Sequence, residues 1–178
     1  MCIATFNLEK LDDGPDAPMP LAAQLAILRP QLQRLRADVL CLQEVNVRRV
    51  AGAPARVLTA LDRLVEGTPL ASYQRAVSGG PSGPADAHNL VVLSRFPILG
   101  TTQHLHDLVA PPDHALITAE PAVADKRPLR WDRPVLVVYL ALPGGRTLHV
   151  VNVHFKVPLA ANIAGQKLEP FVWRNMSG

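Results

Sequence analysis

Several stretches of this chain have the apolar pattern of buried β-strands. Residues 39–42 and 134–142 run without a polar break, as in strands that are covered on both faces. Residues 1–8 alternate instead, which indicates a strand with two different faces. Further strands are predicted at residues 72–77, 89–99 and 148–156, the second of these as one strand with Pro97 near its end.

Two helices are predicted between the strands. Leucines at positions 21, 25, 28, 32 and 35 repeat at spacings of four and three, which places them on one helix face. Pro30 falls inside this pattern and is expected to kink or restart the helix, since a proline in a helix interior costs about 3 kcal/mol. A second helix is expected from Pro54 to Glu66, with Gly67 as the residue that ends it.

Polar side chains stand at the far ends of three strands. Asn7 lies at the end of the first, Glu44 follows residues 39–42, and Asn152 and His154 share one face of the last. Ligands of layered α/β folds bind in crevices at such strand ends, so we expect Asn7, Glu44 and His154 to converge at one end of the sheets. Because a lone buried carboxylate is costly, Glu44 is expected to have a cation, hydrogen-bond donors or water beside it. A solvated Glu44 and a hydrogen-bonded core His154 are the structural alternatives.

Composition narrows the possible partners. With 178 residues, 48% of them hydrophobic, the chain is long enough for one domain with a sizeable core. The net charge of +3 fits an anionic substrate, but no long lysine or arginine tract marks a nucleic-acid-binding tail. Aromatic residues make up only 4%, so few surfaces could stack on bases.

Cysteine usage and the amino terminus indicate a cytoplasmic protein. Cys2 and Cys41 lie in strand-like runs without CxxC spacing, so we expect both to be reduced core residues. The chain starts without the features of a signal peptide, and its longest apolar runs are too short to span a membrane. A group of polar residues fits no well-defined metal spacing, and its role stays open: His104, His106, Asp113 and His114.

Four separated pieces together resemble a known superfamily. They are TFNLEKL (5–11), ADVLCLQEV (37–45), NLVVLSRFPI (89–98) and LHVVNVHFK (148–156). In this order they are similar to the endonuclease/exonuclease/phosphatase superfamily, the deoxyribonuclease I-like metal-dependent phosphoesterases. The resemblance implies an α/β fold, a four-layer α/β/β/α sandwich of two packed sheets. It covers nearly the whole chain as a single domain, residues 1–178, but only the amino-terminal portion of the family's domain.

The resemblance also assigns roles. Glu44 matches the glutamate that binds a divalent metal, usually Mg²⁺ with Mn²⁺ as a possible substitute. Asn7 matches the asparagine beside it, a catalytic and metal-site residue that helps to orient the metal-site groups or the phosphate. His154 matches the histidine that hydrogen-bonds the scissile phosphate, and Asn152 is expected to assist as a further catalytic residue. The expected substrate-binding residues are Lys156 and Arg95. The substrate class implied is a phosphoester: nucleic acid, a phospholipid head group or a small phosphodiester.

The chain departs from the family pattern after residue 156. The Gly-Asp-x-Asn and Asp-His segments that position and deprotonate the attacking water do not follow, and Asp113-His114 stands too early in the sequence. We therefore expect the chain by itself to be an inactive portion of a metal-dependent phosphoester hydrolase, with no defined protein partner. The alternatives are a non-catalytic remnant that binds phosphate or metal, and an unrelated α/β binding domain with chance motifs.

Overall fold

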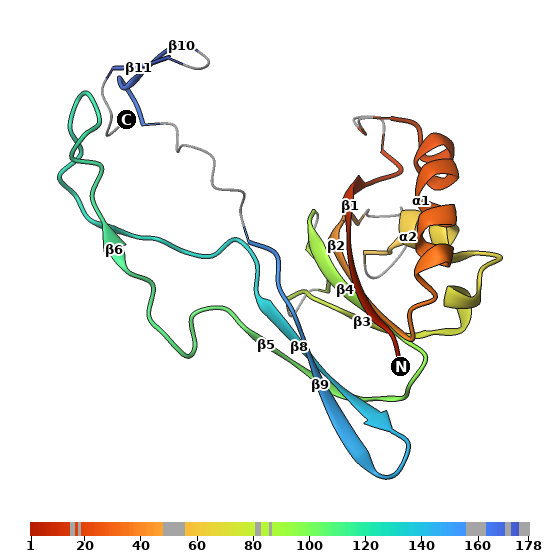
Figure 1. The fold of residues 1–178 in the computed structure, drawn as a ribbon. Helices are drawn as coiled ribbons and strands as arrows, with labels where there is room; N and C mark the ends of the chain where they lie inside the picture. Colours follow the sequence, from red (N-terminus) through yellow and green to blue (C-terminus); the bar gives the residue numbers. More distant parts are fainter. Residues whose placement is uncertain are drawn as a thin grey trace. The chain divides into compact units, whose positions relative to one another are not determined.

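The chain forms two compact units in the computed structural model (Figure 1). The first unit consists of residues 1–104 and 133–154, and the second of residues 105–132 and 155–178. Within these units the structure describes residues 1–14, 17, 19–47, 56–80, 83–85, 87–155, 163–169 and 172–174. The extent of the predicted single domain stays a prediction.

A four-stranded sheet is the centre of the first unit. Its strands lie in the order β1 (Ile3–Leu11), β2 (Val39–Val45), β4 (Asn89–Ser94) and β3 (Gln74–Val77). Strands β1 and β2 are parallel, whereas β4 runs antiparallel to both β2 and β3. The predicted strand at 39–42 is confirmed, and β2 and β4 are buried along almost their whole length.

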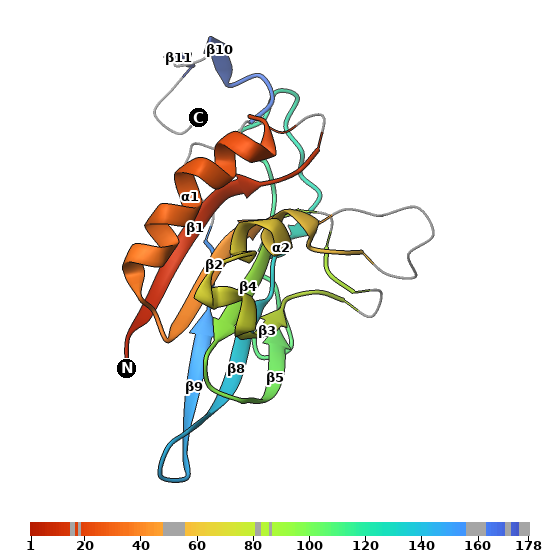
Figure 2. The same cartoon turned by 90° about the vertical axis from the view of Figure 1, so that its right-hand side faces the viewer.

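Helices cover one face of this sheet (Figure 2). Helix α1 (Leu21–Leu35) has the predicted bounds, and it continues through Pro30 as one helix, so the expected restart is wrong. Its leucines pack with Leu40 and Leu42 of β2, because these two side chains alternate onto the helix side of the strand. The remaining helices of this layer are α2 (Thr59–Val65) and the short 3₁₀ helix η1 (Pro69–Ser72).

The second predicted helix is shorter than expected. Helix α2 begins at Thr59, and Arg56 to Leu58 are not helical, whereas Pro54 lies outside the described residues. The buried face of α2 contains Leu61 and Leu64, as the apolar pattern requires.

A second, antiparallel sheet covers the other face of the first. It consists of β5 (Ile98–His104), β8 (Val135–Leu142) and β9 (Arg146–Asn152), with β8 in the middle. Leu136, Val138 and Leu140 of β8 pack against Val39 and Val92 of the first sheet. Two packed sheets with helices on the outer face of the first are the layers that an α/β sandwich requires, which confirms the predicted fold class.

The predicted strand at 89–99 is in fact two strands in different sheets. Strand β4 ends at Ser94, whose hydroxyl accepts a hydrogen bond from the Phe96 main-chain N–H at 3.0 Å and closes a turn. After Pro97, which has no N–H for a strand ladder, β5 begins at Ile98 and pairs with β8. Apolar residues stand on both sides of this turn because Leu90 and Val92 of β4 and Ile98 of β5 border the same core between the sheets.

In the described residues of the second unit, the strands form two short pairs. Strands β6 (Asp113–His114) and β7 (Arg127–Pro128) form one pair, and β10 (Lys167–Glu169) and β11 (Val172–Trp173) form another. Asp113 and His114 are exposed. Among the helices that the structure describes, none has the length and apolar character needed to cross a bilayer.

The two cysteines have different surroundings. Cys41 is buried in the core between the sheets, and burial raises the pKa of its thiol to about 11. Cys2 is exposed just before β1, so the expectation that both cysteines are core residues is wrong for this one. Cys2 is exposed because it precedes β1, and in the described structure no strand packs over the chain ahead of Ile3.

Candidate active site

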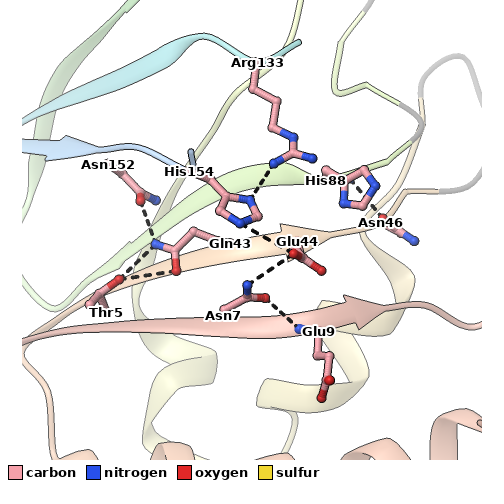
Figure 3. A network of polar contacts seen from close by, with 10 residues as sticks. All are labelled: Thr5, Asn7, Glu9, Gln43, Glu44, Asn46, His88, Arg133, Asn152 and His154. Atoms are coloured by element: carbon pink, nitrogen blue, oxygen red, sulfur yellow. Dashed lines mark hydrogen bonds and ion pairs between the residues drawn. The ribbon is translucent and has the colours of Figure 1, made fainter. Parts of the chain in front are cut away.

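Three polar residues from distant parts of the sequence meet at one end of the first unit. Asn7 Nδ2 donates a hydrogen bond to Glu44 Oε1 at 3.2 Å, and His154 Nε2 lies 3.5 Å from the same oxygen (Figure 3). The side chains of Glu44 and His154 are 17% and 16% exposed, so both are accessible from solvent at the rim of the core. The predicted convergence of Asn7, Glu44 and His154 is confirmed.

A β-bulge turns Glu44 toward this site. Leu42 pairs with Val91, but Val45 pairs with Asn89, so β2 carries one more residue than β4 across this interval. Glu44 has a φ of 59°, in the left-handed region that non-glycine residues adopt at a cost of about 1–2 kcal/mol. Without the extra residue Glu44 would follow Leu40 and Leu42 onto the helix side. With it, Val45 takes that side and Glu44 faces His154.

Asn7 orients the carboxylate of Glu44. Its Oδ1 accepts a hydrogen bond from the main-chain N–H of Glu9 at 2.8 Å, which fixes the orientation of the amide. The Nδ2 group therefore faces Glu44 as a donor. Glu9 and Lys10 both have positive φ values, and β1 has a second irregularity here, so the two bulged strands bend at the same place. This contact holds the carboxylate in position, and a role for Asn7 as a metal ligand stays a prediction.

Arg133 determines which nitrogen of His154 carries the proton. Its guanidinium lies 2.6 Å from His154 Nδ1, and since a guanidinium can only donate, Nδ1 must be the acceptor. The proton of the neutral ring is then on Nε2, which faces Glu44. Burial lowers the pKa of His154, the Arg133 charge lowers it further, and Glu44 partly opposes both effects. The arrangement thus presents a neutral imidazole with an Nε2–H donor directed into the site.

Asn152, the last residue of β9, connects the two sheets next to Glu44. Its side chain is only 2% exposed, and Nδ2 donates to the carbonyls of Leu42 and Val91, each at 3.1 Å. Its Oδ1 accepts from Gln43 Nε2 at 2.8 Å, and Gln43 also donates to Thr5 Oγ1. All of these contacts lie within the sheets, at the bulge that positions Glu44. The expected catalytic role of Asn152 stays a prediction, and its observed contacts are those of a positioning residue.

Of the two expected substrate-binding residues, Arg95 is not brought to this site. Arg95 follows β4 at the opposite end of the first sheet, where Ser94 pairs with Val39, and its guanidinium forms an ion pair with Asp38 at 2.9 Å. Because β4 is antiparallel to β2, the residue after β4 lies beside the start of β2. Lys156 lies outside the described residues.

Two other basic residues, which the sequence analysis missed, lie at the site. Arg133 contacts His154, and His88 is close enough to Glu44, Arg133 and His154 for their charges to affect its pKa. Each stands just before a strand, His88 before β4 and Arg133 before β8. The start of an antiparallel strand lies beside the end of its neighbour. The polar residues just before strands 89–94 and 135–142 could therefore have been predicted to lie beside the site residues at the ends of the neighbouring strands.

Glu44 is the residue of this group that could hold a metal ion. Both of its side-chain contacts with described residues use Oε1, so none of these residues occupies Oε2. Among the described residues no three histidine, cysteine or acidic side chains gather to form a metal site. Any cation at Glu44 would therefore take most of its ligands from water, from substrate or from residues outside the described ranges.

The fold and this site together define a class of α/β sandwich proteins with a polar site at the strand ends of two packed sheets. The model of the Endonuclease/Exonuclease/phosphatase family matches residues 4–165, which is most of the sequence. This chain belongs to the endonuclease/exonuclease/phosphatase family.

Solved structures agree with this fold. An endonuclease/exonuclease/phosphatase family protein from Leptotrichia buccalis C-1013-b is similar with a TM-score of 0.53 and 15% identity, over 92% of this chain and 58% of that one. TDP2 from C. elegans is similar with a TM-score of 0.50 and 15% identity, over 85% of this chain and 34% of that one. This chain therefore spans little more than half the length of the first structure. No curated protein shows a significant match.

Proposed function

We propose that this chain contributes the Asn7–Glu44–His154 part of the active site of a divalent-metal-dependent hydrolase of phosphoester bonds. The observation that carries the proposal is that Asn7 Nδ2 and His154 Nε2 approach Glu44 Oε1 to within 3.2 and 3.5 Å. Asn7 lies where the regular pairing of β1 is interrupted, Glu44 lies near the end of β2, and His154 lies just after β9. Membership of the family supports a phosphoester substrate, and the activity belongs to the complete site rather than to these residues alone.

The charges around Glu44 fit a phosphate ligand. Among the charged groups that act on His88, Arg133 and Lys10 are positive and Glu44 is negative, while the imidazoles of His88 and His154 are neutral. Surplus positive charge around a single carboxylate is unfavourable unless an anion shares the site. A phosphoryl group would supply that anion, and the Nε2–H of His154 is a suitable donor to one of its oxygens.

The donor chemistry at Glu44 fits Mg²⁺. This ion prefers oxygen ligands, keeps several waters, and is commonly bound by one or two carboxylates together with substrate phosphates. Glu44 would hold it through Oε2, with Asn7 fixing the carboxylate from the other side. When bound, the ion would neutralise phosphate charge and stabilise the oxyanion that develops during the reaction.

A direct test measures Mn²⁺ binding by electron paramagnetic resonance, followed by hydrolysis of bis(p-nitrophenyl) phosphate with Mg²⁺. Glu44→Gln keeps the shape of the side chain and removes its charge, so Mn²⁺ affinity is expected to fall at least tenfold. Glu66→Gln is the matched control, because Glu66 is exposed at the end of α2 on the helix side of the sheet. Its Mn²⁺ affinity is expected to equal that of the wild type.

The two measurements separate the candidate functions. Equal Mn²⁺ affinity in wild type and Glu44→Gln would refute the metal site. Metal binding without hydrolysis, in a protein that contains the complete family domain, would instead identify a non-catalytic module that binds phosphate or metal.

A further inference from the structure

His88 occupies a backbone position that favours glycine. Its φ is 59°, in the left-handed region, and its main-chain N–H donates to Asn46 Oδ1 at 3.0 Å. Asn46 in turn donates to Asp12 Oδ2 at 3.2 Å, so the loop before β4 is tied to the loop after β1. A glycine would adopt this conformation without steric cost, whereas a residue with a Cβ stores strain. A side chain kept in such a position points to a use for that side chain.

The imidazole of His88 faces the candidate active site. The groups whose charges act on it are Arg133, Glu44, Lys10 and His154, and Figure 3 shows its ring beside Arg133 above Glu44. These groups come from strands of both sheets or from residues next to them, so the ring lies beside strand ends of both sheets. Burial is the largest cause of its lowered pKa, and the neighbouring cations add to it. The ring is therefore neutral at pH 7.

The two ring nitrogens of His88 have different surroundings. Nδ1 is enclosed and has no hydrogen-bond partner among the residues that the structure describes. An enclosed N–H without an acceptor is more costly than an enclosed acceptor without a donor, which favours the tautomer with its proton on Nε2. The nitrogen available to a ligand is then an N–H donor, like that of His154.

We propose that His88 is a further substrate-binding residue of this site, donating from Nε2 to an oxygen of the phosphoryl group. The inference rests on the proposed function, because it takes the anion at Glu44 to be a phosphoester. It adds a second imidazole donor on the β4 side of the site, across Glu44 from Asn7. A phosphoryl group between His88 and His154 would receive donors from both sheets, since His88 precedes β4 and His154 follows β9.

The test uses the strained backbone to separate binding from folding. His88→Gly removes the donor and relieves the strain, so the melting temperature is expected to stay equal or rise. The affinity for phenyl phosphate, measured by ³¹P nuclear magnetic resonance, is expected to fall about tenfold, which is the loss of one hydrogen bond to a charged group. His88→Asn keeps a donor and tolerates a left-handed backbone, so it is expected to recover part of the affinity.

His114→Ala is the control, because it removes an exposed imidazole from β6 in the other unit and is expected to leave phenyl phosphate affinity unchanged. The titrations are run with and without Mn²⁺, so that the His88 contact is measured whether or not a metal binds. Unchanged phosphate affinity in His88→Gly would overturn the role of His88 and leave the metal site intact. If His88→Gly lowered both the melting temperature and the phenyl phosphate affinity, the binding role of His88 would also be overturned, because the side chain would then act in folding.

Discussion

Replacing Asn152 by alanine should destabilise the first unit more than any change on the exposed face of β9. The side chain is 2% exposed and makes three hydrogen bonds, to the Leu42 carbonyl, the Val91 carbonyl and Gln43 Nε2. Each contributes about 1 kcal/mol net, so the substitution should lower the free energy of unfolding by roughly 3 kcal/mol. Domains have only about 5–15 kcal/mol in total, so the loss would be easily measured.

Urea denaturation followed by circular dichroism measures this loss. Asn152→Asp is the informative companion, because it keeps the volume and an acceptor for Gln43 but removes both donors to the carbonyls. It should destabilise at least as much as alanine. Thr147→Ala is the matched control: Thr147 is exposed on the same strand and its change should stay within about 0.5 kcal/mol. A loss below about 1 kcal/mol in Asn152→Ala would refute the view that this side chain fastens the two sheets together.

Two further predictions follow from the titratable groups. Because the folded-state pKa values of His88 and His154 lie below the ordinary value of 6.5, the unfolded chain binds protons more readily. Their contribution to stability is complete above pH 6.5 and is lost as the pH falls below it. The melting temperature of the wild type should therefore decline as the pH is lowered from 7.5 to 5.5, and that of His154→Asn should decline less. An equal decline in the wild type and in His154→Asn would contradict the reasoning. In the folded protein a maleimide should modify the exposed Cys2 and spare Cys41, because Cys41 is buried and burial raises the pKa of its thiol to about 11. Mass spectrometry of the modified peptides would show this difference, and rapid labelling of Cys41 would argue against its burial.

The sequence alone determined the main layers and the principal residues of the candidate site. Strand 39–42 was predictable because its apolar run admits no exposed face, and helix 21–35 because its leucines repeat at helical spacing. Asn7, Glu44 and His154 were found since each follows apolar residues at the predicted end of a strand, although β1 in fact continues past Asn7 to Leu11. These features depend on neighbours a few residues apart along the chain, and local patterns report them directly.

The tertiary structure alone decided how those residues face one another. The division of 89–99 between two sheets, the bulge that turns Glu44 away from α1, and the places of His88 and Arg133 all depend on which strands pair and in which register. A bulge is one extra residue opposite a partner strand, so it is undefined until the partner is known. Packing of the two sheets joins residues more than a hundred positions apart, as the hydrogen-bonded side chains of Gln43 and Asn152 are, and no local pattern contains that information.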